Sequence, residues 1–419
     1  MTELLNVDDV LERILSGLHA LDDETVDLLH AHGRILAEDI HAEQHVPAFA
    51  SSAMDGFAVR AADLTGASAD RPVRLLVIGD IPAGTRPDVS IQAGQAARIM
   101  TGAPVPPGAD AVIRVEDTSE QWASDGEAPL PEHVDVFRAV EPGRDLRQAG
   151  ESIQAGERAL TRGITLRPVD VGVIAALGRA TVAVARRPRV AILSTGTELV
   201  APGALLELGQ IYNSNSYMLA ALVSEAGGEP IVVPTALDTV ADVRRRFDEA
   251  LAQQPDLIVS SAGVSVGTHD VVRTVIDALG HIDLWRVNIR PGKPLAYGQV
   301  GGVPFFGLPG NPVSALVTFE VFVRPSLARL SGAIDASPAM VEAALAEDVR
   351  SDGRRSFLRV RLEREGQQWR AHPLGMQSSA ELLALARADG LLIVPEGVRQ
   401  APAGSRYQVR LLRALSDGR

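Results

Sequence analysis

Cysteine is absent from the 419 residues of this chain, and aromatic residues make up only 4% of it. The first absence excludes disulfide bonds, thiolate metal ligands and cysteine nucleophiles, and it is typical of a reducing compartment. The second means that the cores consist mainly of Ala, Val, Leu and Ile. No apolar run reaches the length of a membrane span, and the N-terminus lacks a signal-peptide pattern. We therefore expect a cytoplasmic protein without a membrane partner.

Basic residues are fewer than acidic ones, since 40 Lys and Arg accompany 53 Asp and Glu, for a formal net charge of −13. This balance argues against a general nucleic-acid partner. The P-loop pattern G-x-x-x-x-G-K-[ST] is missing, as is a Ser-His-Asp signature. Apolar residues make up 46% of the chain and charged residues 22%, which is typical of a globular protein. The length predicts roughly three or four domains.

The stretch from 188 to 330 alternates short apolar runs with amphipathic helical patterns, which is typical of an open α/β sheet. Three apolar runs, at 189–193, 257–260 and 304–308, each lead into a loop rich in small residues. We expect parallel strands that deliver these loops to one carboxyl edge, where such sheets bind ligands. Loop N–H groups and the N-termini of the following helices favour an anionic ligand there.

Periodicity divides the rest of the chain into further units. Strands are expected at 74–78 and 96–100 and, after residue 330, at 356–362, where apolar residues alternate. Helices are expected at 7–18, 31–40 and 167–177. We predict a multidomain α/β chain with a central doubly wound domain at 179–330, an inserted β domain at 45–140, a helical and mixed domain from 1–44 plus 141–178, and a C-terminal β-barrel-like domain at 331–419.

Acidic residues stand at loop ends near the expected ligand edge. Glu198, Asp238 and Asp270 lie in the central stretch, and Asp55 precedes Gly56 in a loop of the N-terminal half. Singly, each is most often a solvated loop acid, a turn former or a helix cap. An anion-binding site that is surrounded by carboxylates, however, needs a bound cation to offset the repulsion between the negative charges. Mg²⁺ suits this role, since it takes one or two carboxylates plus substrate phosphates.

Other polar residues allow two interpretations each. Arg290 and Lys293 are flanked by prolines and a glycine; such residues are usually surface, but beside anion-type loops they are candidates for binding phosphate or an oxyanion. Thr101 begins a proline-rich loop that is either a structural turn or a ligand-presenting segment. His269 has no predicted partner, and a loop residue without a specific role is the favoured interpretation.

Six motifs occur in one order along nearly the whole chain. They are Ser-Ala-Met-Asp-Gly at 52–56, Met-Thr-Gly-Ala-Pro at 100–104, Ser-Thr-Gly-Thr-Glu-Leu at 194–199, Gly-Val-Ser-Val-Gly at 263–267, Pro-Gly-Lys-Pro at 291–294 and Gly-Leu-Pro-Gly-Asn-Pro at 307–312. Together they resemble the molybdopterin molybdenumtransferase family, which includes the bacterial MoeA proteins and the E domain of gephyrin.

This resemblance implies an elongated homodimer of four-domain chains, whose central domain shares the fold of the molybdopterin adenylyltransferases. It implies Mg²⁺-dependent insertion of molybdate into adenylylated molybdopterin, with AMP as the second product. A transient contact with the molybdopterin adenylyltransferase, which would hand over the substrate, is a further implied partnership.

The family pattern also implies roles for individual residues, in sites that two chains share. The implied catalytic residues are Asp55, Thr101, Glu198, Asp238 and Asp270, of which Glu198 and Asp270 are the implied metal ligands. The implied substrate-binding residues are Arg147, Ser194, Thr195, Gly196, Gly263, Ser265, Gly267, Arg290, Lys293, Pro309 and Pro312. Arg290 stands where the family usually has lysine, and it keeps the charge with a different geometry.

Two other functions stay open at this point. A central domain of this kind also occurs in nucleotide-processing hydrolases, although the motif at 52–56 argues against that class. The same fold can serve a non-catalytic molybdopterin-binding or scaffold protein, but the sequence shows no additional linker or disordered tail that would support such a role.

Overall fold

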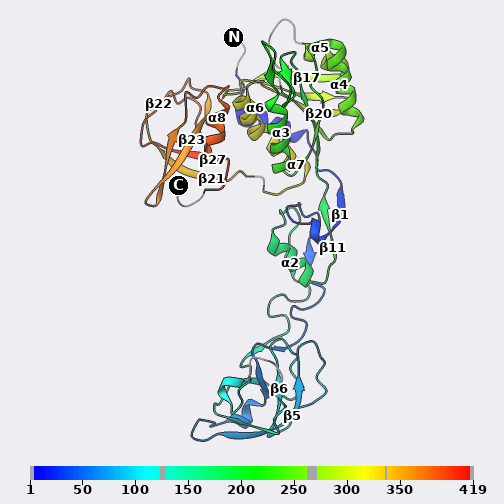
Figure 1. Ribbon diagram of the computed structural model, residues 1–419, viewed down its shortest axis with the longest axis vertical. Helices are drawn as coiled ribbons and strands as arrows, with labels where there is room; N and C mark the ends of the chain where they lie inside the picture. Colours follow the sequence, from blue (N-terminus) through cyan, green and yellow to red (C-terminus); the bar gives the residue numbers. More distant parts are fainter. Residues whose placement is uncertain (1–3, 123–128, 262–270, 336, 416–419) are drawn as a thin grey trace.

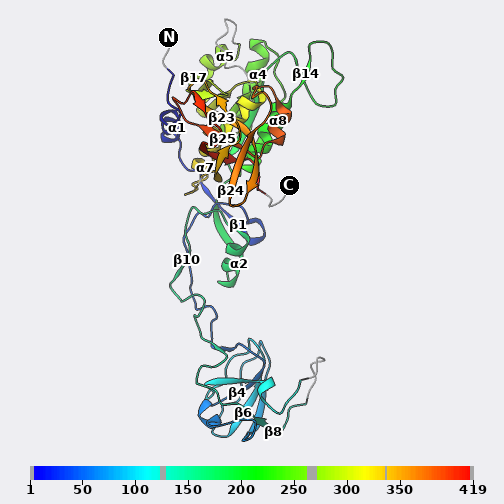
Figure 2. The same cartoon turned by 90° about the vertical axis from the view of Figure 1, so that its left-hand side faces the viewer.

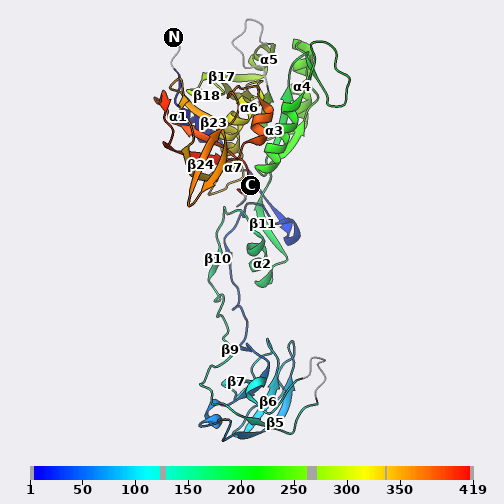
Figure 3. The same ribbon diagram turned by 60° about the vertical axis from the view of Figure 1, so that its left-hand side comes forward.

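The computed structural model describes residues 4–122, 129–261, 271–335 and 337–415, and it is an elongated molecule (Figure 1). A head at one end holds the central and C-terminal units, a slender stalk follows, and a β domain lies at the far end. The turned views agree on this arrangement (Figure 2 and Figure 3). The chain passes through the stalk on its way to the β domain and again on its return, so the β domain is an insertion, as expected.

The central sheet contains the three expected strands as parallel neighbours. Its strands are β12 (Arg189–Ser194), β15 (Glu229–Val232), β16 (Leu257–Ser261), β17 (Gly280–Arg286), β19 (Pro294–Val300) and β20 (Val303–Leu308). The order is β15-β12-β16-β20-β19-β17, and the first four strands are parallel. The other two run antiparallel, so the sheet is mixed rather than parallel throughout. Gly301 and Gly302, with φ of 59° and 81°, close a tight hairpin from β19 to β20.

Helices cover both faces of this sheet, as a doubly wound domain requires. Val190 and Ile192 of β12 pack with helix residues on one face, while Ala191 and Leu193 pack on the other. The first face carries α3 (Ser214–Glu225), α6 (Pro312–Thr318) and α7 (Arg324–Leu330), the last two joined by a π-helical turn, Phe319–Val323; the second face carries α4 (Val240–Ala252) and α5 (Val271–Leu279).

Helix α1 (Val7–Ser16) packs in the central core, which corrects the assignment of residues 1–44 to the mixed domain. Its stripe of Val7, Val10 and Ile14 is buried in the same cluster as residues of β12 and β20. The Asn6 side chain caps the helix by accepting a hydrogen bond from the backbone N–H of Asp8 at 2.7 Å. Amphipathic periodicity predicts a helix but not which apolar face will cover it, and this explains the error.

The stalk is built from two strand pairs and one helix. They are β1 (Asp23–Asp27) with β11 (Thr181–Ala185), β2 (Ile40–His41) with β10 (Arg158–Leu160), and α2 (Pro168–Ala176). Helix α2 begins with a proline and ends before Gly178, as expected. The helix expected at 31–40 is wrong. Gly33 has a φ of 74°, and Leu36 forms a bridge to Val184, so the chain is extended there.

The distal β domain has a five-stranded sheet of order β7-β4-β6-β5-β8, and it contains the strands expected at 74–78 and 96–100. The strands are β4 (Gly56–Val59), β5 (Val73–Ile81), β6 (Gln95–Ile99), β7 (Ala111–Arg114) and β8 (His133–Val136). A short pair, β3 (Ser51–Ser52) with β9 (Leu146–Arg147), joins this domain to the stalk.

The C-terminal unit is a closed barrel, because β23 pairs with both β24 and β25. Its strands are β21 (Met340–Leu345), β23 (Arg355–Glu365), β24 (Gln368–Pro373), β25 (Gly390–Val394) and β27 (Arg406–Leu411), with helix α8 (Leu382–Arg387) and a short pair, β22 (Val349–Arg350) with β26 (Gln400–Ala401). This confirms the barrel-like prediction. None of the helices in the described ranges has the length and apolar character that a membrane crossing requires.

Candidate functional site

The carboxyl ends of β12, β16 and β20 lie side by side, as predicted. Ser194 of β12 is in register with Ser261 of β16, which is in register with Leu308 of β20. The ends of these three strands therefore form one edge of the sheet, called here the ligand edge. Ser194 is buried, and its hydroxyl is hydrogen-bonded to that of Ser216 at 2.8 Å. Ser194 thus fixes the start of its loop to helix α3.

The loop after β12 carries the carboxylate of Glu198 and contacts that of Asp238. Thr197 donates to Asp238 Oδ2 from its backbone N–H at 3.0 Å and from its hydroxyl at 3.3 Å. The adjacent Glu198 folds back over Gly196, where an added Cβ would lie 2.7 Å from Glu198 Oε2. With a φ of 154° as well, a side chain at position 196 would be strained, and Thr195 beside it is buried.

These two carboxylates fit a Mg²⁺ ion that also binds a substrate phosphate. Among the described residues no three acidic or histidine side chains form a metal cluster, so a protein-only cage is not part of this fit. The remaining predicted residues of the edge, Gly263, Ser265, Gly267 and Asp270, lie outside the described residues, as does His269.

The predicted basic loop reaches the same edge from the other side of β20. Its first part, β18 (Ile289–Arg290), pairs in parallel with β23 of the barrel. Asp352 is held by Arg354 at 2.9 Å, and this hydrogen bond lowers the pKa of Asp352. The Arg290 guanidinium lies 4.0 Å from the same carboxylate, and Lys293 is exposed just before β19. Two cationic side chains therefore border the ligand edge.

The loop after β20 connects the edge to the C-terminal barrel. Pro309 is buried within this loop. Pro312 occupies the first position of α6, where an N–H group would have no partner within the helix, so its absence costs nothing. The Asn311 side chain donates to Ser379 Oγ at 3.0 Å, and the Ser379 carbonyl accepts from Val313 N–H at 3.1 Å. A segment of the barrel unit thus lines the site.

Arg359, which we did not predict, is buried beneath that segment with 1% of its surface exposed. It donates to the Ser378 carbonyl at 2.8 Å and contacts Glu381 at 3.4 Å, while its Nε has no partner among the described residues. Burial lowers its pKa. In an alternating strand such an arginine looks like an ordinary outward residue, so the local sequence pattern does not reveal its burial.

Asp55 and Thr101 come together in the distal domain. Thr101 donates to Asp55 Oδ1 from its N–H at 2.7 Å and from its hydroxyl at 2.8 Å. Arg147 lies nearby in β9, which pairs with β3 at the start of the Asp55 loop. This distal cluster is at the opposite end of the elongated chain from the ligand edge, with the stalk between them (Figure 1).

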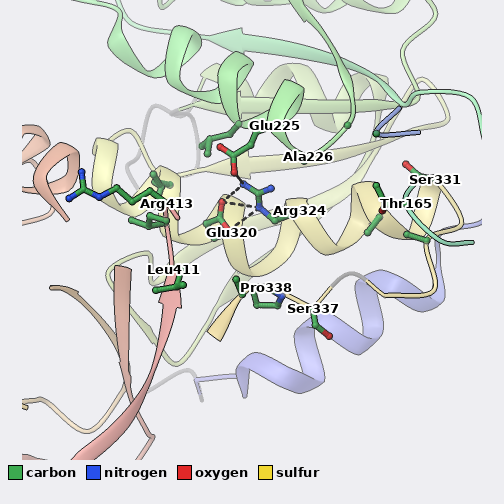
Figure 4. A pocket seen from close by; sticks show the side chains of 18 of the residues that line it. Thr165, Glu225, Ala226, Glu320, Arg324, Ser331, Ser337, Pro338, Leu411 and Arg413 are labelled. Carbon is green, nitrogen blue, oxygen red and sulfur yellow. Dashed lines mark hydrogen bonds and ion pairs between the residues drawn. The ribbon is translucent and has the colours of Figure 1, made fainter. Parts of the chain in front are cut away.

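A cavity of about 920 Å³ opens where the head meets the stalk (Figure 4). In its wall Arg324 donates to Glu320 at 2.7 Å and to Glu225 at 3.1 Å. None of the predicted site residues that the structure describes lines this cavity. The ligand edge, not this cavity, is therefore the candidate site.

Comparisons with known proteins agree with this architecture. Three family models match in order: "MoeA N-terminal region (domain I and II)" at 5–178, "Probable molybdopterin binding domain" at 191–329 and "MoeA C-terminal region (domain IV)" at 342–412. The chain is 41% identical over 392 residues to molybdopterin molybdenumtransferase 2 of Mycobacterium tuberculosis H37Rv, covering 92% of this chain and 94% of that one. It is 38% identical over 383 residues to the molybdopterin molybdenumtransferase of Nostoc, covering 90% and 86%.

Solved structures give the same result over the full length. The molybdopterin biosynthesis MoeA protein of Pyrococcus horikoshii OT3 superimposes with a TM-score of 0.81 at 30% identity, covering 98% of this chain and 100% of that one. The arrangement of head, stalk and distal domain is therefore shared. The chain belongs to the MoeA family of molybdopterin molybdenumtransferases, transferases of molybdenum cofactor biosynthesis.

Proposed function

We propose that this chain catalyses Mg²⁺-dependent insertion of molybdate into adenylylated molybdopterin and releases AMP, in the cytoplasm. The observation that carries this proposal is the make-up of the ligand edge. Cationic Arg290 and Lys293 lie on one side of it and acidic Glu198 and Asp238 on the other, at the ends of parallel strands. Such an edge can bind two anions and one divalent cation together.

Each side of the edge has its own part in this chemistry. Arg290 and Lys293 would bind the oxygens of molybdate or phosphate, because the negative charge of these oxygens offsets the positive charge of the two side chains. Glu198 and Asp238 would hold Mg²⁺ with Asp270, and the bound ion would neutralise charge that develops on the pyrophosphate. Thr197 keeps Asp238 oriented toward this position through two hydrogen bonds. These residues would also orient the water that cleaves the pyrophosphate bond.

We further propose that a second copy of the chain completes each site. The distal β domain, which contains Asp55 and Thr101, lies beyond the stalk from the central sheet (Figure 3), so these two residues serve this reaction only if a partner presents them. A two-fold homodimer would supply two equivalent shared sites. The pyrophosphate bond of the substrate is an anhydride that water can hydrolyse when the substrate is free in solution. This favours a transient contact with the adenylyltransferase that makes the substrate.

The test is AMP release from adenylylated molybdopterin by the purified protein. We expect release only when both Mg²⁺ and molybdate are present, and a chelator should abolish it. Asp63→Asn, which changes an acid away from both clusters, is a matched control that should leave the rate unchanged. Full release in the presence of chelator would overturn the role of the metal, and no release with all components would overturn the function.

A further inference from the structure

Asn215, the second residue of α3, has a side chain that joins two strands of the ligand edge. Its Nδ2 donates to Ser261 Oγ at the end of β16 and to the Gly310 carbonyl after β20, both at 2.7 Å. Because a carbonyl oxygen can only accept, the Gly310 contact fixes which end of the amide is nitrogen. The other end, Oδ1, is buried and has no hydrogen-bond partner among the described residues.

This unpaired oxygen is an exception among its neighbours. The Asn213 side chain accepts from Ser216 N–H at 3.1 Å and donates to the hydroxyls of Ser216 and Thr235, each at 3.0 Å. Ser194 pairs with Ser216 as described above. The side chains around the start of α3 thus satisfy one another, and the Asn215 oxygen alone in this group does not. Burial of an unpaired acceptor costs folding free energy, so its retention needs an explanation.

The chemistry of the oxygen limits what can satisfy it. An amide oxygen accepts hydrogen bonds, and it cannot pair with the pyrophosphate of the proposed substrate or with molybdate, because both are fully ionised at neutral pH and their oxygens only accept. The hydrogen-bond donors of the proposed substrate are the N–H groups of its two heterocycles, the pterin and the adenine, and the two ribose hydroxyls of its adenosine part. We propose that Asn215 Oδ1 accepts a hydrogen bond from one of these neutral donors, in the pterin or in the adenosine, an inference that rests on the proposed function.

This contact also orients the substrate along the edge. Asn215 lies at the ends of β16 and β20, while Lys293 precedes β19, on the far side of β20. The neutral part of the substrate that carries this donor is therefore bound at the α3 corner, and the anionic groups extend across β20 toward Lys293. Asn215 discriminates for a hydrogen-bond donor, whereas Lys293 discriminates for charge.

The test compares the binding of three probes, AMP, molybdopterin and molybdate, to wild-type protein and to variants by calorimetry. Asn215→Ala should weaken one of the two heterocyclic probes about tenfold, the effect of one hydrogen bond, and leave molybdate unchanged. Which probe weakens identifies whether the pterin or the adenosine is the donor. Asn215→Gln, which keeps both the amide oxygen and the amide N–H donor, should recover part of the lost affinity. Asn213→Ala, which removes a satisfied amide of the same cluster, should lower the melting temperature and leave the affinities unchanged.

Several results would overturn the inference. Wild-type affinity of Asn215→Ala for both heterocyclic probes would mean that a water molecule satisfies the oxygen. Equal weakening of all three probes would mean that Asn215 is structural. If Asn215→Ala does not fold, wild-type-like melting of Asn215→Gln with affinity lost for both AMP and molybdopterin would count against the contact. Wild-type protein that binds the heterocycles but releases no AMP would refute the proposed function and leave this inference standing, whereas failure to bind either heterocycle would refute both.

Discussion

Replacement of Asp145 should loosen the segment that carries Asp55. The Asp145 carboxylate accepts from Arg114 Nε at 2.8 Å and Nη2 at 2.9 Å, and its carbonyl accepts from Ala53 N–H at 2.8 Å. Arg114 in turn is the strand partner of Gly56. The two partners of this ion pair therefore contact the segment 51–56 at two points, Asp145 through its backbone carbonyl and Arg114 through strand pairing. Asp145 itself is left-handed, with a φ of 51°, a conformation that Asp and Asn tolerate better than other residues with a Cβ.

The structure separates two contributions to this effect. A left-handed Ala costs roughly 1 kcal/mol more than Asn or Gly. The bidentate pair contributes about 1 kcal/mol, a value reduced for solvent because Arg114 is 39% exposed although Asp145 is only 12% exposed. Asp145→Ala should thus lower the free energy of local opening by about 2 kcal/mol, and Asp145→Asn or Asp145→Gly by about 1 kcal/mol. Amide exchange in 51–56 should accelerate roughly thirtyfold and fivefold respectively.

Hydrogen exchange followed by mass spectrometry measures this directly. Asp135→Ala is the matched control, because Asp135 accepts a similar pair of bonds from Arg74 at 2.8 and 3.0 Å in the same domain, away from the 51–56 segment. We expect normal exchange of 51–56 in that control. Unchanged exchange in Asp145→Ala, or equal acceleration in the control, would refute the reasoning.

The same pair predicts an acid dependence. Hydrogen bonds from Arg114 hold the pKa of Asp145 below its usual value of 3.8. Because the folded pKa is the lower one, the carboxylate stabilises the segment at pH values above 3.8, and this contribution fades as the pH falls through the lowered pKa. Wild-type protein should therefore show an acid-dependent acceleration of exchange in 51–56 that Asp145→Asn lacks.

Three further changes test the two residue clusters. Thr101→Val removes the hydroxyl donor to Asp55 and keeps the N–H donor, so AMP release should fall roughly tenfold, while Thr101→Ser should stay near normal; equal rates would contradict this role. Lys293→Ala should raise the Kd for molybdate and flatten its salt dependence, as calorimetry at two ionic strengths would reveal. Asp238→Asn should raise the Mg²⁺ concentration needed for half-maximal AMP release, and an unchanged requirement would remove it from the metal site.

Local sequence signals predicted the elements that form the ligand edge. Apolar runs followed by small-residue loops identified β12, β16 and β20, and the proline at 168 with the glycine at 178 bounded α2. These signals are reliable because each reflects a local requirement, burial on both faces of a strand or a restricted φ. The hairpin glycines Gly301 and Gly302 are a similar local signal for the turn between β19 and β20.

Features that depend on distant contacts could not be predicted in this way. The stripe of α1 did not reveal that it packs in the central core, and the alternation around Arg359 did not reveal that this arginine is buried under the 378–381 segment. The unpaired Asn215 oxygen likewise depends on Gly310, which lies 95 residues away in the sequence. Local patterns fix what an element is, while long-range packing decides what it touches.

The site shared between two chains is the central claim, and complementation tests it most directly. Asp55→Asn and Asp238→Asn proteins, each nearly inactive, are mixed under conditions that exchange subunits, and AMP release is measured. In a mixed dimer one shared site collects both mutations and the other collects both wild-type carboxylates. Random exchange makes about half of the dimers mixed, so roughly a quarter of wild-type activity should return. If each site instead lies within one chain, every site in a mixed dimer carries one of the two mutations, and AMP release does not return. No recovery of AMP release, with subunit exchange confirmed by mass, would contradict the shared site.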